Sequence, residues 1–451
     1  MSNNNDTGLS STSSLYRAIW RWHFYAGLIA IPFMVLLAVT GSLYLFKDEI
    51  DRTLFSHRNV VTPEAATLTP EAIVAAALAK APRATATAYK DPATPDSSAI
   101  VTLATDGGDR KVYVNPYSGE VLGSVGAKDE FNWVVKKIHS LDYVGVYANR
   151  WMEAIGGFAI VLMVSGFYLW WPRDRPGGVF KVRWMPGKRA LWRDLHAVSG
   201  AYLGIIALFL AVSGMPWSGV WGGQLNSLTT SLGLGYPAQL WDAVPTSDAS
   251  LHHAVPDAGW TVENSPLPES TPHAAAQPIG LDKAVEIAKA AGIFAGFDMA
   301  LPGGADGVYT ASIFPDRLSD QRTIHIDQYS GKPLVDLDFA DYGGAAQAIE
   351  WGINVHQGQE WGLFNQLLML SACLAILLMS VSAIVMWWKR RPRGRVGVPP
   401  YPSDRRVYFG LWVIAVVVGL VFPMTGIAIL GMLVIDLLLI RTIPPLRRAF
   451  G

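Results

Sequence analysis

Nine histidines occur in the sequence, and four of them stand at matched positions. His23 and His196 each begin an apolar segment that has a glycine 18 positions further on. His139 and His356 each precede a Trp-Trp pair by 31 positions and a glycine by six. An ionisable side chain at the edge of a membrane segment is costly and is by default a functional candidate. Because these four form two equivalent pairs, they are the candidate site.

The positions of these histidines along the apolar segments determine which of them can share a ligand. His23 and His196 are expected at one membrane face and His139 and His356 at the other, so a mixed pair would have to reach across the hydrocarbon core. Two opposed imidazoles without cysteine or carboxylate companions are typical of a b-type haem held between helices, whereas zinc needs three or four ligands around one point. A glycine four residues after His23, and likewise after His196, removes a side chain from the same helix face and makes room for a flat macrocycle. The sequence therefore predicts two haem b groups, each with its iron bound axially by one pair.

The other residues with reactive side chains are expected to be structural. Four histidines lie in polar segments and are interpreted as surface residues, with weak metal binding at the adjacent two as the alternative: His57, His252, His253 and His273. His325 lies in an alternating segment and is interpreted as a structural strand residue. The single cysteine, Cys373, excludes an internal disulfide, a thiolate zinc site and a Cys-ligated iron–sulfur cluster. No glycine-rich nucleotide fingerprint follows an expected strand, and no catalytic residue is assigned.

The segments that position the histidines are long and apolar. Of the 451 residues 51% are hydrophobic and 16% are charged, whereas about 25% charged residues are usual in soluble proteins. A membrane-spanning helix needs roughly 20 mostly apolar residues, and four segments meet this requirement: about 22–46, 151–171, 194–215 and 363–388. A further stretch, 407–440, contains Pro423 and Gly426 in its middle. We expect it to form a hairpin of two short helices, with one long kinked helix as the alternative.

The distribution of Lys and Arg predicts the orientation. These residues gather before the first span, in the segments 173–193 and 389–406, and at the C-terminal end. Because cytoplasmic loops carry the excess of Lys and Arg, the N-terminus is expected in the cytoplasm. Two long polar insertions, about 48–150 and 216–355, then face outward. With 36 Lys+Arg against 36 Asp+Glu and no basic cluster in the polar regions, the chain has no electrostatic footprint for nucleic acid.

The two halves of the chain repeat each other. Residues 111–122, KVYVNPYSGEVL, align with residues 323–334, TIHIDQYSGKPL, at an offset of 212. An Ala-rich stretch (69–81 and 281–291) precedes each motif, followed by alternating segments that predict strands. Each insertion is therefore expected to be a small α+β module. Each half of the chain crosses the membrane outward and then back inward. The two halves therefore have the same orientation, and an axis along the membrane normal relates them. The predicted fold is an α-helical integral membrane protein with a pseudo-two-fold four-helix bundle, a C-terminal helical hairpin and two outer α+β modules.

These features resemble the PepSY-associated transmembrane proteins of bacterial inner membranes. The resemblance rests on the duplicated Tyr-Ser-Gly modules, the repeated His-bearing spans and the span ends Trp170-Trp171-Pro-Arg and Trp387-Trp388-Lys-Arg, and covers about residues 15–395. Within the family the chain is most similar to the FoxB-type ferric-siderophore (ferrioxamine) reductases. Membership implies an inner-membrane dihaem protein with periplasmic PepSY-like modules that reduces ferric siderophores and releases Fe²⁺ for iron uptake. The haem-ligand role is carried over by position in the repeat to His23, His196, His139 and His356.

The implied domain organisation follows the spans. The expected parts are a cytoplasmic tail 1–14, TM1 15–47, PepSY-like module 1 48–130, TM2 with a periplasmic extension 131–172, a cytoplasmic loop 173–193, TM3 194–215, PepSY-like module 2 216–350, TM4 with a periplasmic extension 351–388, a basic cytoplasmic loop 389–406, a C-terminal TM hairpin 407–440 and a cytoplasmic tail 441–451.

The implied reaction is electron transfer across the membrane. An unidentified cytoplasmic reductase or a quinol would supply electrons to the inner haem, and a periplasmic ferric siderophore, suspected to be of the hydroxamate type, would accept them from the outer haem. Six aromatic residues are candidates for the acceptor pocket and equally for the interfacial belt: Trp217, Trp221, Tyr143, Tyr147, Trp351 and Trp361. Two alternatives stay open, a non-enzymatic membrane sensor or inhibitor and a metal-ion transporter.

Overall fold

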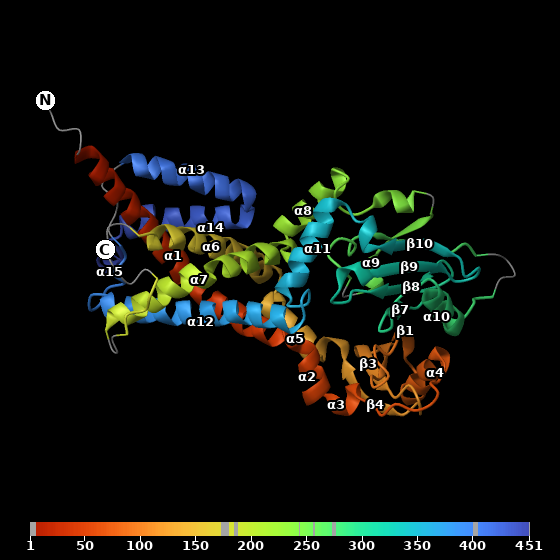
Figure 1. Cartoon of the computed structure of the whole chain (residues 1–451). Helices are drawn as coiled ribbons and strands as arrows, with labels where there is room; N and C mark the ends of the chain where they lie inside the picture. Colours follow the sequence, from red (N-terminus) through yellow and green to blue (C-terminus); the bar gives the residue numbers. More distant parts are fainter. Residues whose placement is uncertain are drawn as a thin grey trace.

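The computed structural model of the chain describes residues 6–172, 180–184, 188–242, 244–255, 258–272, 277–399 and 405–450. His273 and parts of the expected loops 173–193 and 389–406 lie outside these residues. The described chain has a helical region, which contains both termini, and a sheet region beside one end of it (Figure 1). The end of the helical region next to the sheet is the sheet-proximal end, and the opposite end is the sheet-distal end.

Five helical segments among the described residues are long and apolar enough to cross a membrane: Ser14–Tyr44, Val146–Trp170, Arg189–Trp217, Leu363–Arg390 and Pro423–Ile440. They belong to α1 (Asp6–Tyr44), α6 (Val146–Trp170), α7 (Arg189–Gly214), α12 (Leu363–Arg390) and α14 (Pro423–Val434) with the π-helical turn Ile435–Ile440. Helix α1 packs against α6 and α12, and α7 packs against the same two helices. Small buried residues such as Ala26, Ala30 and Ala159 line these contacts, which allows the backbones to approach closely.

The C-terminal segment forms two helices rather than one kinked helix. Helix α13 (Arg405–Val421) ends before Phe422, and α14 begins at Pro423, because a residue that precedes proline disfavours the helical conformation. The two helices lie side by side (Figure 1), and Gly419 and Gly426 approach each other so closely that a Cβ on Gly426 would overlap the facing backbone. The segment therefore folds back on itself as the sequence predicted.

The sheet region is one antiparallel sheet of eight strands in the order β10-β9-β8-β7-β1-β2-β3-β4. The strands are β1 (Thr85–Lys90), β2 (Ala99–Thr105), β3 (Gly108–Val114), β4 (Val121–Gly126), β7 (Asp298–Ala300), β8 (Val308–Ile313), β9 (Arg322–Asp327) and β10 (Pro333–Asp338). Each predicted module supplies four of them, and β1 pairs with β7 at the junction, Tyr89 opposite Met299. The two α+β modules expected from the sequence therefore share one sheet, a pairing that was not predicted from the sequence. Joining the modules covers two strands that would otherwise be exposed edges.

Two helices cover one face of this sheet. They are α4 (Pro70–Lys80) and α10 (Leu281–Ala290), the Ala-rich stretches of the repeat, and they bury Ile73, Leu103, Phe297 and Ile324 between helices and strands. On the opposite face of β9 and β10, a segment that contains Trp241 and Leu251 packs against Leu337. His325 points to this second face, where it is 1% exposed and its Nδ1 lies 2.9 Å from Thr310 Oγ1.

Short helices connect the sheet to the spans. Helix α5 (Phe131–His139) precedes α6, and α11 (Gly344–His356) precedes α12. Gly145 has φ +113° and Gly362 has φ +56°, and each directly precedes a span. These backbone conformations favour glycine, which explains the matched glycines six residues after each outer histidine. The chain therefore turns between His139 and the span, as the polar segment in the sequence predicted.

Candidate functional site

His23 and His196 face each other near the sheet-distal end of the bundle. His23 lies on α1 and His196 on α7, and their ring centroids are 6.3 Å apart with ring planes at 88°. A metal ion lies about 2 Å from a bound imidazole nitrogen and the ring centre about 1 Å behind that nitrogen, so two axial rings have centres roughly 6 Å apart. The observed separation fits one ion held axially between these two rings.

The Nδ1 atoms of this pair already have hydrogen-bond partners in neighbouring helices. His23 Nδ1 lies 2.9 Å from Ser165 Oγ on α6. His196 Nδ1 lies 2.9 Å from the Met379 carbonyl oxygen on α12 and 3.3 Å from Ser382 Oγ. Hydrogen bonds to one imidazole nitrogen orient the ring and leave the other nitrogen for a metal. The nitrogens available in this pair are therefore the Nε2 atoms.

His139 and His356 are held in the same way at the sheet-proximal end. His139 is the last residue of α5, and its Nδ1 lies 2.8 Å from Thr40 Oγ1 on α1. His356 is the last residue of α11, and its Nδ1 lies 3.0 Å from Ser213 Oγ on α7. Each outer histidine thus reaches back from a short helix to the end of a span.

Burial keeps both outer imidazoles neutral. Desolvation, with a smaller contribution from His356, lowers the pKa of His139 to about 4. Desolvation likewise lowers the pKa of His356 to about 4. A neutral imidazole is the form that binds a metal. Both outer histidines are therefore in the form that a metal needs.

The two pairs are separated by about the thickness of a membrane core. His23 and Thr40, the partner of His139, are 17 residues apart on α1, which corresponds to about 26 Å at 1.5 Å per residue. The hydrocarbon core of a bilayer is about 30 Å thick. One pair can therefore lie near each face of the membrane.

Glycines touch the outer histidine rings. A Cβ on Gly41 would lie 3.7 Å from His139 Cε1, and a Cβ on Gly214 would lie 3.2 Å from His356 Cε1. These are the glycines that follow the inner histidines by 18 positions in the sequence. At Gly214 a Cβ would press on the ring of His356, whereas at Gly41 it would be in ordinary contact with the ring of His139.

Gly27 and Gly200, the glycines expected to make room for a macrocycle, lie against neighbouring helices. A Cβ on Gly27 would lie 3.8 Å from Leu162 Cδ2, and a Cβ on Gly200 would lie 3.3 Å from Met379 Sδ. Both positions face a neighbouring span, where the lack of a side chain allows the helices to pack closely. The structure thus gives these two glycines a packing role between helices.

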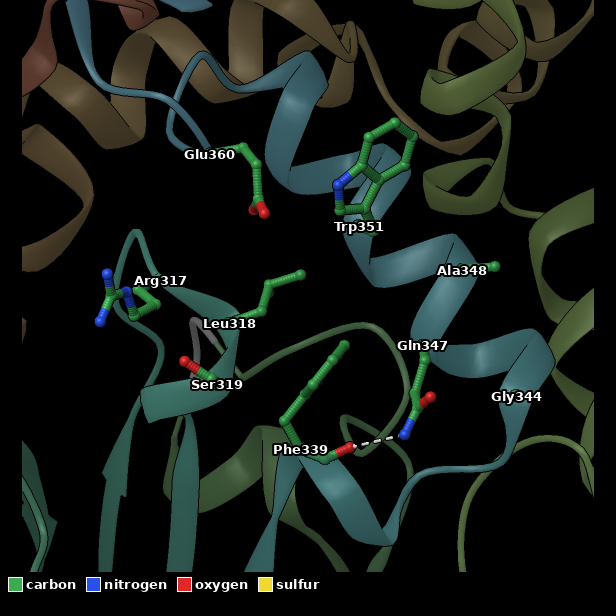
Figure 2. Close-up of a pocket in the computed structure, with 9 residues that line it drawn as sticks. All are labelled: Arg317, Leu318, Ser319, Phe339, Gly344, Gln347, Ala348, Trp351 and Glu360. Atoms are coloured by element: carbon green, nitrogen blue, oxygen red, sulfur yellow. Dashed lines mark hydrogen bonds between the residues drawn. The ribbon is translucent and has the colours of Figure 1, made fainter.

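A cleft of about 610 Å³ opens between α11 and the β8–β9 loop (Figure 2). Its lining residues are Arg317, Leu318, Ser319, Phe339, Gly344, Gln347, Ala348, Trp351 and Glu360. Trp351 stands on the same helix as His356, and its ring packs edge-on against Phe209 of α7, 6.3 Å between centroids. Gln347 donates a hydrogen bond to the carbonyl oxygen of Phe339, 3.2 Å, in the turn between β10 and α11. The cleft therefore lies beside the helix that ends at an outer histidine.

Of the six aromatic pocket candidates, the structure brings two together here. Trp351 lines the cleft, and Trp361 lies against it with ring centroids 6.2 Å apart. The other four have separate contacts or exposure: Lys136 over the Trp217 ring, Phe422 beside Trp221, Trp133 beside Tyr143, and solvent at Tyr147.

The polar residues of the cleft were not predicted from the sequence. Arg317 and Ser319 lie in the β8–β9 connection, which spans 314–321, whereas the equivalent β2–β3 connection has only the residues 106–107. A longer loop at one copy of a repeated hairpin is a break in the repeat, and such insertions are frequently functional. This difference in loop length is the signal that could have indicated the cleft.

A family model described as PepSY-associated TM region matches residues 20–390 of the chain. The matched region includes all four histidines, the shared sheet and the cleft, and it ends before α13. The comparison with curated proteins finds no match. Among the described residues, no group of three or more His, Cys, Asp or Glu side chains could hold a metal ion.

Proposed function

The chain belongs to the PepSY-associated transmembrane family, and from that premise we propose that it is a dihaem oxidoreductase of the bacterial inner membrane that reduces a periplasmic ferric siderophore. The observation that carries this proposal is the separation of 6.3 Å between the ring centres of His23 and His196. Two opposed neutral imidazoles suit axial ligation of a b-type haem. The specific likeness to FoxB-type reductases is part of the same proposal.

Four histidines of the chain would hold the two groups. His23 and His196 would bind one haem, and His139 and His356 would bind the other. When bound, each haem would supply a carrier for one electron at a time. The residues of the chain orient the imidazoles through hydrogen bonds at Nδ1. Between the two pairs the helices bury apolar residues such as Met34, Ala38 and Ile376, whereas a transport path for metal ions would place polar groups near the midplane.

The orientation follows from the basic residues at the sheet-distal end. Several Arg and Lys residues stand there at or near the span ends: Arg183, Arg189, Arg193, Lys389, Arg390 and Arg391. By the positive-inside rule this end would face the cytoplasm. The sheet and the cleft would then face the periplasm. The donor, a cytoplasmic reductase or a quinol, would deliver electrons near His23 and His196.

The cleft is the proposed acceptor site. Trp351, Leu318 and Phe339 give it apolar walls, and Arg317 and Gln347 add polar groups. A hydroxamate siderophore combines alkyl spacers with amide and oxygen groups, which matches such a mixed lining. Trp351 and His356 are five residues apart on α11, about 7.5 Å along the helix. A chelate in the cleft would therefore stand close to the outer pair.

Reduction explains how such a protein would release iron. Hard oxygen donors hold Fe³⁺ far more tightly than Fe²⁺, so the transfer of one electron to the bound Fe³⁺ loosens the complex and frees Fe²⁺. The electron comes from the donor through the two histidine pairs, and the siderophore leaves as the free ligand. No covalent step on the chain is required.

Purification in detergent followed by absorption spectroscopy tests the proposal. We expect a reduced b-type spectrum, two haems per chain, and reoxidation by ferrioxamine with Fe²⁺ trapped by a chelator. The variant His196→Ala should lose one haem and keep the other, whereas His57→Ala, an exposed histidine, should keep both. A colourless protein would refute the proposal and favour a sensor or inhibitor. A protein with two haems that no ferric siderophore reoxidises would refute the substrate assignment.

A further inference from the structure

Every candidate ligand has a hydroxyl group at its Nδ1 atom. The pairs are Ser165 with His23, Ser382 with His196, Thr40 with His139, and Ser213 with His356. The hydroxyl groups occur at equivalent positions of the two repeats. Thr40 and Ser213 are 173 positions apart, which is also the offset from His23 to His196. The ligands and their hydroxyls therefore repeat together.

The direction of each hydrogen bond follows from the number of hydroxyl protons. A hydroxyl group has one proton to donate. Thr40 Oγ1 donates its proton to the Leu36 carbonyl oxygen at 2.7 Å, and Ser213 Oγ donates to the Phe209 carbonyl oxygen at 2.7 Å. Toward the histidine, each oxygen can then only accept.

The same geometry holds at the sheet-distal pair. Ser165 Oγ donates to the Val161 carbonyl oxygen, so toward His23 it accepts. The Met379 carbonyl oxygen, 2.9 Å from His196 Nδ1, has no proton to give. A hydroxyl that already donates its proton elsewhere cannot donate to Nδ1, and neither can a carbonyl oxygen. In both cases Nδ1 has to carry the hydrogen.

We propose that Thr40, Ser165, Ser213 and Ser382 are positioning residues that fix all four histidines in the Nδ1–H tautomer. The tautomer leaves the lone pair of each imidazole on Nε2, the nitrogen that can face iron. The acceptor at Nδ1 also raises the basicity of the ligand, and a more basic axial ligand favours the ferric over the ferrous state. The effect on iron rests on the proposed function, whereas the tautomer itself is a property of the apo chain.

Redox titration of matched variants tests the effect on iron. Thr40→Val removes the hydroxyl and keeps the branched shape of the side chain, and Ser213→Ala removes the hydroxyl at His356, the other ligand of the outer pair. We expect one of the two haem potentials to rise by up to about 59 mV, a tenfold change in the ferric/ferrous ratio for a one-electron couple, with both haems retained. The control Ser371→Ala loses a hydroxyl that donates to the Leu368 carbonyl oxygen, and both potentials should stay unchanged. Unshifted or lowered potentials in Thr40→Val and Ser213→Ala would overturn the positioning role.

Nitrogen NMR of labelled histidine provides a readout that needs no haem. In the protein freed of haem, the four buried imidazoles should show protonated Nδ1 and unprotonated Nε2, and Thr40→Val should convert one of them to a mixture of tautomers. Protonated Nε2 in the unaltered protein would overturn the inference. A protein that never contains haem but shows the Nδ1–H tautomer would refute the proposed function and leave the tautomer assignment standing.

Discussion

Alanine at the two repeat-related glycines, Gly41 and Gly214, should have unequal effects on the outer histidines. At Gly214 the new Cβ would lie 3.2 Å from His356 Cε1, closer than ordinary van der Waals contact, so the ring has to move by a few tenths of an ångström. That movement strains the hydrogen bond from His356 Nδ1 to Ser213 Oγ. Overpacking costs about 1–3 kcal/mol, and a loss of about 1.4 kcal/mol in ligand binding is tenfold in affinity.

The matched substitution at Gly41 is the control. Its Cβ would lie 3.7 Å from His139 Cε1, which is ordinary contact, and alanine is favoured over glycine in a helix by about 1 kcal/mol. We therefore expect Gly214→Ala to bind the outer haem about tenfold more weakly and Gly41→Ala to bind it nearly unchanged, with equal or higher thermal stability. Haem content during dilution or competition with an apo haem-binding protein measures the difference. Equal losses in both variants, or a larger loss in Gly41→Ala, would refute the reasoning from ring contacts.

Three further substitutions test other parts of the structure. Asp436→Asn should lower the free energy of unfolding by about 3–5 kcal/mol, because the buried guanidinium of Arg21 loses the carboxylate charge 2.6 Å away; chemical unfolding in detergent measures the loss, and an unchanged midpoint would contradict it. Trp351→Ala should raise the KM for a ferric siderophore about tenfold with haem content unchanged, and an unaltered KM would remove the cleft from the substrate path. Burial and the charge of Glu350 raise the pKa of Glu263 to about 7, above its value in the unfolded chain, so its contribution to stability is present at acid pH and is lost as pH rises through 7. The melting temperature of Glu263→Gln should accordingly fall less between pH 5 and pH 8 than that of the unaltered protein, and parallel curves would contradict the shift.

The candidate site could be selected from the sequence because the chain is duplicated, so that histidine positions in one half can be compared with those in the other. A single histidine beside Trp and Arg has no special meaning, but His23 and His196 recur at one offset and His139 and His356 at another. The structure brings the rings of His23 and His196 within 6.3 Å of each other, and it holds His139 and His356 by equivalent hydrogen bonds to Thr40 and Ser213. The prediction of a multi-pass membrane protein of the PepSY-associated family is confirmed by the apolar helices and the family match. Binding of haem remains a prediction.

Other features could not be read from the sequence because they depend on contacts between distant segments. An alternating pattern predicts a strand without naming its partner, so the pairing of Tyr89 with Met299, which merges the two modules into one sheet, was not foreseen. Helical spacing placed Gly27 on the face of His23, but only packing shows that its neighbour is Leu162. In both cases local periodicity identifies the element, and tertiary contacts decide what it touches.

The duplication also shows where the two halves have diverged. At the offset of 217 that relates His139 to His356, the counterpart of Trp351 is Val134, and the counterpart of Glu360 is Tyr143. The cleft beside α11 therefore has no equivalent lining beside α5, although both helices end at a histidine in the same environment. If electrons pass from the outer pair to a chelate, this difference between the two halves indicates that they leave on the side of His356. Placing tryptophan at Val134 would add one wall without the long β8–β9 loop that supplies the other, so it should create no second acceptor site and leave the rate of siderophore reduction unchanged.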